Sequence, residues 1–204
     1  HLFSSAASDV YKRQIKACKN VGWSDDLINK TKFVDTGADA IKLNEVEVVI
    51  EATGFPAAGI EHARQAFQNG KHIIMVNVEA DVLAGAALAK EANSVGVVYS
   101  MAYGDQPALT AEIVEWARAS GFNVTSAGKG TRYQPIYHKS SPDTVWDYYG
   151  LTHEEARKAG MNPKMFNSFL DGTKSGLEMA AIANACDLEV PTNGLLFPPC
   201  GMDD

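Results

Sequence analysis

Basic side chains gather in the stretch GFNVTSAGKGTRYQPIYHKSSPDTVW, at residues 121–146. Lys129, Arg132, His138 and Lys139 follow the segment FNVTSAG, whose apolar pattern predicts a buried strand. Such a group at a strand end could hold a phosphate or a carboxylate, and the guanidinium of Arg132 offers two parallel donors for it. The alternative is a solvated basic loop, a common surface feature.

Lys129 is the first candidate for a role in catalysis. It lies between Gly128 and Gly130, and glycine lets a backbone approach a ligand closely. An ammonium group in that position can donate a proton or stabilise a developing alkoxide.

The segment DGTKSGLEM holds a second candidate. Asp171 or Thr173 could cap a helix that starts there, which leaves Lys174 in the first turn and Glu178 one turn later. A lysine in the first turn opposes the helix dipole, so stability alone does not favour it. We therefore consider an anion site at this helix start, with an ordinary surface pair of Lys174 and Glu178 as the alternative.

The elements that must position these residues alternate between strand and helix. Apolar runs at 46–54, 72–77, 96–104 and 122–128 predict strands, and the segments between them predict helices. Crossovers of this length make neighbouring strands parallel, so we expect a Rossmann-like, doubly wound α/β sheet; part of a barrel is the alternative. Ligands of such sheets bind beyond the carboxyl ends of the strands, which here read EATGFP, VNVEAD, YGDQP and SAGKGTRY.

The chain after Lys139 is predicted to be mainly helical. Thr152 and Glu155 form a capping-box pattern, and a longer helix begins near Thr173. Trp116 and Trp146 fit core positions. We place a boundary near residue 130, with residues 15–130 as a partial nucleotide-binding domain that lacks its first strand and residues 131–204 as a catalytic lobe. The segment DVYKRQ matches a translated library adapter, so residues 1–14 are interpreted as a cloning scar on an internal, inactive fragment.

Composition excludes several classes of protein. The chain of 204 residues is 46% hydrophobic and 21% charged with a net charge of -7, which argues against nucleic acid as a partner. Its apolar runs are too short to span a membrane. Cys18, Cys186 and Cys200 are widely spaced, which favours free thiols in a reducing cytoplasm. No metal-ligand spacing appears, and neither do the motifs G-x-S-x-G and G-x-G-x-x-G.

The run VVIEATGFPAAGIEHARQAFQNGKHIIMVNVEADVLAGAALAKEANSVGVVYSMAYGDQP resembles the nucleotide-binding domain of homoserine dehydrogenase, over residues 46–131. In that family a lysine follows the strand-end asparagine, whereas Val78 and Glu79 follow Asn77 here. With GDQPAL, GKGTRYQP and DGTKSGLEMAAIANA added, residues 15–200 look more like reductoisomerase-like oxidoreductases that often carry a SAF domain. One branch resembles deoxyxylulose-5-phosphate reductoisomerase and uses NADPH.

This resemblance implies roles for particular residues. NADP, or NAD, would bind near Thr53, Gly54, Asn77 and Glu79. The catalytic candidates are Lys129, Lys174 and Glu178. The substrate-binding candidates are Asp105, Gln106, Arg132, Tyr133, His138 and Lys139.

The sequence therefore predicts an NAD(P)H-dependent, reductoisomerase-like oxidoreductase for a small anionic, phosphorylated carbonyl compound. We expect a cytoplasmic homo-oligomer that binds neither nucleic acid nor membrane, and no ligand set in the sequence demands a metal. Two alternatives stay open: a non-catalytic sensor or accessory protein with the same fold, and a homoserine-dehydrogenase-like enzyme.

Overall fold

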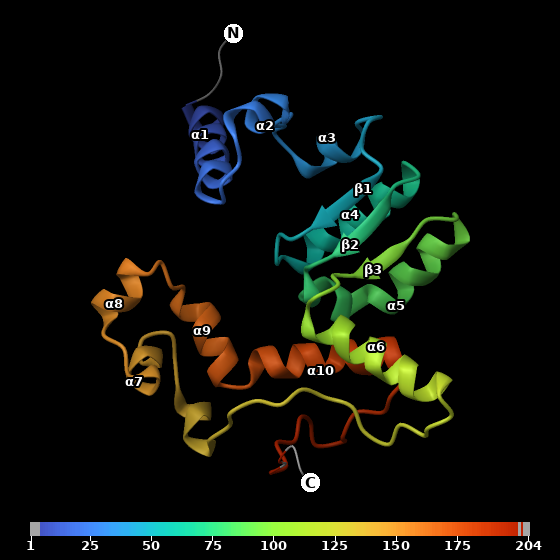
Figure 1. The fold of residues 1–204 in the computed structure, drawn as a ribbon, viewed down its shortest axis with the longest axis vertical. Coiled ribbons are helices and arrows are strands. Elements are labelled where there is room, and N and C mark those ends of the chain that lie inside the picture. The colour runs from blue at the N-terminus through green and yellow to red at the C-terminus, as the bar shows by residue number, and fades with distance from the viewer. Residues whose placement is uncertain (1–4, 200, 202–204) are drawn as a thin grey trace. The chain divides into compact units, whose positions relative to one another are not determined.

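A computed structural model describes residues 5–199 and residue 201 (Figure 1). The chain divides into two compact units, His1–Glu47 and Val48–Asp204, and each is described by itself. Residues 1–4 of the proposed cloning scar and Cys200 lie outside the described residues. The boundary expected near residue 130 falls inside the second unit and stays a prediction.

The described part of the first unit contains three helices: α1 (Ser5–Asn20), α2 (Asp25–Lys30) and α3 (Gly37–Ile41). Hydroxyl side chains cap the two short helices, because Ser24 accepts from the N–H of Leu27 and Thr36 accepts from that of Asp39. The unit buries Ile28 and Ile41.

The second unit begins with a parallel three-stranded sheet in the order β1 (Val48–Glu51), β2 (His72–Met75) and β3 (Tyr99–Met101). Val48 pairs with His72, and Ile73 with Tyr99. The expected mixed α/β architecture with a parallel sheet is confirmed, in this small form.

The prediction of a fourth strand at residues 122–128 is wrong, because no strand forms there. Val124 and Ala127 pack instead against a core of Val114, Ile182 and Cys186. Their apolar side chains therefore pack against helices and not within the sheet, of which β3 is an edge strand.

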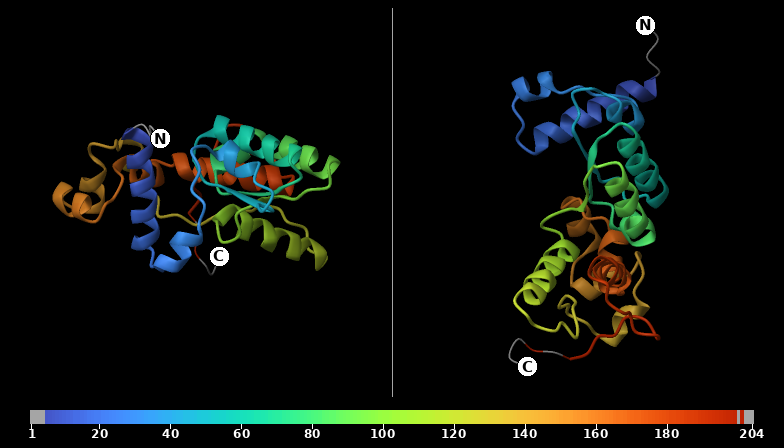
Figure 2. Two further views of the ribbon diagram at one scale, coloured as in Figure 1. Left: turned by 90° about the horizontal axis from the view of Figure 1, so that it is seen from above. Right: turned by 90° about the vertical axis from the view of Figure 1, so that its right-hand side faces the viewer.

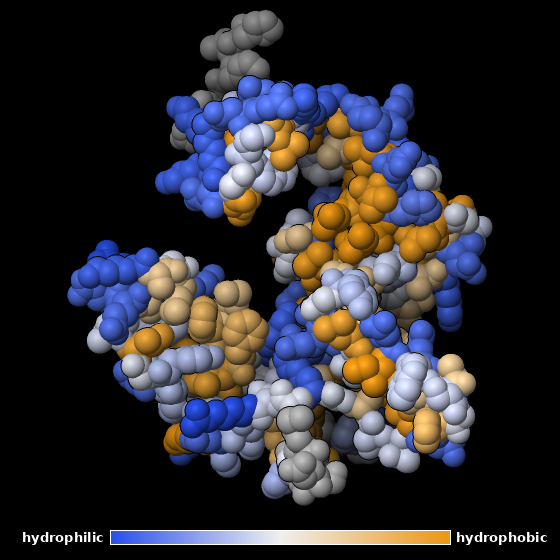
Figure 3. Space-filling view, viewed as in Figure 1, coloured by the Kyte–Doolittle hydropathy of each residue, from blue (hydrophilic) through white to orange (hydrophobic). Residues whose placement is uncertain are grey.

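Helices α4 (Pro56–Gln68) and α5 (Val78–Ser94) pack against each other and against the sheet (Figure 2). Alanines and Leu88 are buried between these elements, and small side chains let helices approach closely. On the opposite face of the sheet Val48 and Ile50 are 47% and 67% exposed, and Figure 3 shows an apolar surface over the sheet.

Helix α6 (Gln106–Ala119) follows β3 and packs against α10 (Thr173–Cys186), which also contacts α5. The face of α6 toward α10 carries Val114, which is buried. The expected core position of Trp116 is wrong, since its side chain is 66% exposed on the other side of the helix. Periodicity indicated an apolar stripe, but the position of α10 decides which side of α6 is buried.

The segment between Lys129 and α10 is a series of short helices: η1 (Pro135–Lys139), α7 (Val145–Tyr149), α8 (His153–Lys158) and α9 (Pro163–Leu170). Val145, Trp146 and Ala156 form their buried core, which confirms the expected position of Trp146. The capping box of Thr152 and Glu155 is also confirmed. Within the described residues, no helix is long and apolar enough to cross a membrane.

Candidate functional site

A buried carboxylate ends β1. Glu51 is 2% exposed, and its Oε1 accepts from the backbone N–H of Thr53 at 3.3 Å and from Nδ1 of His62 at 3.2 Å. Burial by itself raises the pKa of Glu51, but hydrogen bonds from Thr53, Asn77 and His62 outweigh it and hold the pKa below its ordinary value. We call Glu51, Thr53, His62 and Asn77 the β1-end cluster.

The side chain of Asn77, the expected cofactor residue at the end of β2, makes hydrogen bonds within the protein. Its Oδ1 accepts from the N–H of Ala80 at 3.2 Å and caps α5, while its Nδ2 donates to the carbonyl of Phe55 at 3.0 Å. The side chain is 1% exposed. Asn77 thus braces the turn that contains Thr53 and Gly54, and both of these residues are exposed. Gly54 has a φ of 67°, which favours glycine.

The end of β3 holds a different group. Asp105 caps α6 through the N–H of Gln106, at 2.9 Å. The ammonium of Lys129 donates to Oε1 of Gln106 at 2.8 Å and forms an ion pair with Glu178 of α10. We call Gln106, Lys129 and Glu178 the lysine cluster. The side chains of Lys129 and Glu178 are 16% and 3% exposed, whereas Gln106 is exposed and opens the cluster to solvent.

A close approach of two segments explains why Lys129 meets Glu178. A Cβ placed on Gly128 would lie 3.1 Å from Sδ of Met179 on α10, so the chain before Lys129 runs against this helix. The neighbouring residue of Met179 is Glu178, which the same approach brings to the ammonium. Gly128 therefore serves helix contact, whereas a Cβ on Gly130 would meet no atom within 4 Å.

Lys129 in the lysine cluster keeps a hydrogen-bond donor that could contact a bound molecule. An ammonium carries three N–H donors, and Lys129 directs donors at two partners, Gln106 and Glu178. A remaining donor can reach the oxygen of a bound molecule. The buried carboxylate of Glu178 fixes the position of the ammonium through the ion pair.

Lys174 takes part in a looser contact. Its Nζ lies 3.9 Å from Oε1 of Glu79, and the two side chains are 23% and 34% exposed. This contact joins the first turns of α10 and α5. The alternative of a surface pair between Lys174 and Glu178 is wrong, because each of these residues pairs with a different partner.

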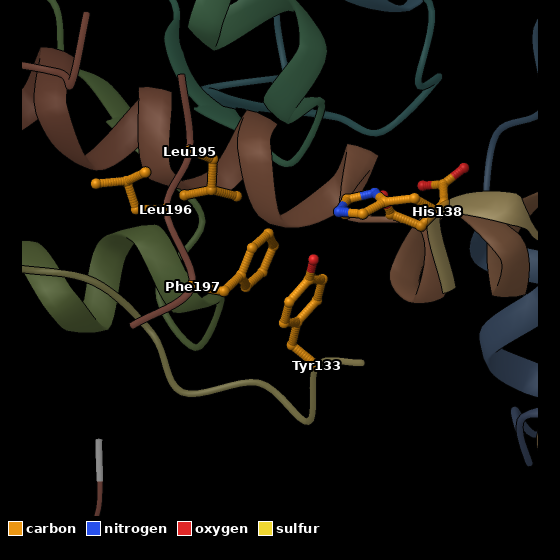
Figure 4. Close-up of a pocket in the computed structure, with 7 residues that line it drawn as sticks. Tyr133, His138, Leu195, Leu196 and Phe197 are labelled. Atoms are coloured by element: carbon orange, nitrogen blue, oxygen red, sulfur yellow. The ribbon is translucent and has the colours of Figure 1, made fainter. Parts of the chain in front are cut away.

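The other basic residues do not join the lysine cluster. Arg132, His138 and Lys139 are exposed. Nδ1 of His138 donates to the carbonyl of Asp171 at 2.9 Å, and the ring of Tyr133 stacks on that of Phe197 with centroids 4.2 Å apart. A pocket of about 400 Å³ opens here, shown in Figure 4. It is lined by Tyr133, His138, Asp171, Gly172, Leu195, Leu196 and Phe197.

Sequence reasoning missed two buried acids. Glu51 and its partner His62 were not singled out, although the glutamate that ends the apolar run VVIEATG was a visible signal. Asp81, in the first turn of α5, is 6% exposed and accepts from the hydroxyl of Tyr99 at 2.7 Å. Burial raises the pKa of Asp81, against the opposing effect of that hydrogen bond. Among the described residues, no cluster of potential ligands suits a metal ion.

Residues 104–204 match the model of the family described as oxidoreductase DRL, catalytic domain. The match supports an oxidoreductase. It spans every catalytic and substrate-binding candidate, from Asp105 to Glu178, and none of the residues expected to bind the cofactor. A search of the curated proteins finds no match to this chain.

Proposed function

We propose that this chain belongs to an NAD(P)H-dependent, reductoisomerase-like oxidoreductase that acts on a small anionic, phosphorylated carbonyl compound. The lysine cluster is the observation that carries the proposal. It places a charged ammonium, held by Gln106 and Glu178, beside the carboxyl end of β3. It also lies wholly within the residues that match the oxidoreductase family.

The exposed turn at Thr53 and Gly54 fits one edge of a dinucleotide. It lies at the carboxyl end of β1 in a parallel sheet. Gly54, whose left-handed conformation favours glycine, has no side chain that would cover the surface of this turn. Asn77 would act through this turn rather than by contact, since its amide is buried. Glu79, half-buried beside Lys174, would border the same edge. A bound nicotinamide would supply the hydride.

The role of Lys129 follows from its partners. Gln106 and Glu178 hold the ammonium, so the remaining donor can point at a carbonyl oxygen. As that oxygen gains negative charge during reduction, the ammonium stabilises it and can transfer a proton to it. Glu178, by its ion pair, holds the ammonium in place for this role.

The anionic end of the substrate would meet cations that the protein leaves accessible. Arg132 and Lys139 are exposed, and the guanidinium of Arg132 can hold two oxygens of a phosphate. Lys174 lies 3.9 Å from Glu79, a distance at which a phosphate could displace the carboxylate. These residues follow Lys129 in the chain or lie one turn from Glu178 on α10.

The test is NADPH and NADH oxidation by protein expressed from the complete gene, with a panel of phosphorylated ketoses and aldehydes. Turnover that the Lys129→Met variant loses and the Lys90→Met variant, at an exposed position outside the proposed site, keeps would support the proposal. Nucleotide binding by fluorescence without turnover would favour the sensor alternative. Absence of both turnover and nucleotide binding would reject an NAD(P)-dependent enzyme.

A further inference from the structure

The pocket shown in Figure 4 has a chemical character different from that of the lysine cluster. Its walls are mainly apolar: the stacked rings of Tyr133 and Phe197 stand beside the hydrocarbon of Leu195 and Leu196. The two rings are nearly parallel, with an angle of 8° between their planes. A surface of this kind favours the face or edge of another ring over a hydrated ion.

His138 supplies a polar group with a defined orientation. Its Nδ1 lies 2.9 Å from the backbone carbonyl of Asp171, and a carbonyl only accepts hydrogen bonds, so Nδ1 carries the proton. When the ring carries this proton alone, Nε2 is the acceptor. Figure 4 shows the tip of this ring directed toward Tyr133 and Phe197, and the ring centroids of His138 and Tyr133 are 5.4 Å apart.

The acid next to His138 is already engaged. Oδ1 of Asp171 accepts from the N–H of Thr173, and Oδ2 accepts from Nδ2 of Asn167, both at 2.9 Å. The carboxylate is thus committed to the turn before α10. The side-chain hydroxyl of Tyr133 and Nε2 of His138 are the polar atoms that the pocket can offer from its labelled residues (Figure 4).

Gly172 shapes the floor of the pocket. It has a φ of 91°, which side chains rarely adopt, and a Cβ placed on it would lie 3.3 Å from Cζ of Phe197 and 3.6 Å from Cε1 of His138. The glycine allows these two rings to approach the same backbone turn. The aromatic wall and the acceptor nitrogen are therefore held together by the local fold.

We propose that this pocket binds a small aromatic ring that carries a hydroxyl group. The ring packs on Tyr133, Phe197 and the leucines, and the hydroxyl donates to Nε2 of His138. The volume of about 400 Å³ accommodates a single ring with a substituent. This site goes beyond the proposed function, because it requires neither a nicotinamide nor turnover.

Phenol is the probe, with anisole and cyclohexanol as matched compounds. Anisole keeps the ring and lacks the donor, whereas cyclohexanol keeps the hydroxyl and lacks the aromatic face. Titration followed by protein-observed NMR, with the side-chain nitrogens of His138 assigned, gives each affinity and shows where the compound binds. We expect a Kd for phenol on the order of 1 to 10 mM, which suits a ligand of this size. Anisole and cyclohexanol should each bind roughly threefold to tenfold more weakly.

Three variants separate the contributions. Tyr133→Leu should weaken phenol binding roughly threefold to tenfold, while Tyr133→Phe should leave it within about twofold. His138→Phe keeps an aromatic ring at this position and removes both ring nitrogens, so phenol and anisole should bind to it equally. Thermal unfolding of each variant verifies that it is folded.

Several results would overturn the site: no perturbation of His138 by phenol up to about 50 mM, equal affinity of the wild-type protein for phenol and anisole, or full binding by Tyr133→Leu. None of them bears on whether the protein oxidises NADPH. A protein that binds phenol at His138 and turns over no carbonyl compound would keep this site and lose the proposed function.

Discussion

The β1-end cluster and the lysine cluster both lie at carboxyl ends of strands, and both contain a buried glutamate, yet they use it differently. Glu51 receives hydrogen bonds from neutral groups and His62, in a network that braces a turn. Glu178 faces an ammonium that also reaches the exposed Gln106. Glu51, within a network of hydrogen bonds, supports the backbone of a turn, whereas Glu178 positions a cation that can take part in chemistry.

Among the substitutions that test this difference, removal of Lys129 should have the largest effect on turnover and on stability. In a Lys129→Met variant, turnover of a carbonyl substrate should fall at least about a hundredfold, the usual loss when a donor to a developing oxyanion is removed. The free energy of unfolding should fall by about 3 kcal/mol, because Glu178 is left buried without its cation. Steady-state NADPH oxidation and urea unfolding measure the two effects.

A second substitution separates these effects. Adding Glu178→Gln to Lys129→Met should recover most of the lost stability and none of the turnover, since it removes the unpaired charge alone. Lys139→Met, at an exposed position, is the matched control and should stay within about 0.5 kcal/mol of the wild type. Unchanged turnover in Lys129→Met would remove this residue from the mechanism.

Asn77 tests the bracing role of the β1-end cluster. Asn77→Ala removes the cap of α5 and the donor to Phe55, and we expect the free energy of unfolding to fall by about 2 kcal/mol. Asn77→Asp keeps the capping oxygen but loses the donor and places a second buried carboxylate beside Glu51, so it should cost at least as much as Asn77→Ala. Chemical unfolding gives both values. If Asn77→Ala were as stable as the wild type, the buried amide would have no structural role.

Glu51 makes stability depend on pH in one direction. Its folded pKa is lower than the unfolded value of 4.5, so its contribution is complete above the unfolded value and is lost as the pH falls through the folded pKa. The Glu51→Gln variant should therefore lose less stability than the wild type between about pH 5 and pH 3. Urea unfolding at several pH values tests this, with the exposed Glu61→Gln as control. An equally steep loss in Glu51→Gln would contradict the assigned shift.

The contact of Lys174 with Glu79 should have the smallest effect on stability. Both side chains are partly exposed and 3.9 Å apart, so Lys174→Met should change the free energy of unfolding by less than about 1 kcal/mol. A rise in KM for a phosphorylated substrate, with stability unchanged, would assign Lys174 to the anion. Unchanged KM and kcat would leave it as a surface contact.

The sequence predicted elements where a local pattern decides them. Apolar runs placed three parallel strands, and the capping pattern of Thr152 and Glu155 placed the start of α8. It failed at residues 122–128, whose apolar pattern also suits a chain packed against helices. It failed for Trp116 as well, because an apolar stripe does not say on which side a partner helix will lie.

The candidate site divides in the same way. The sequence by itself determined the residue types at the strand ends, the glycines around Lys129 and the start of α10 near Lys174. Only the tertiary structure decided that Lys129 pairs with Glu178, that Lys174 turns to Glu79, and that Tyr133 and His138 line an apolar pocket. Local patterns reflect backbone preferences over a few residues. These contacts depend instead on how α10 packs against α5 and α6, and that packing involves segments that are distant in the chain.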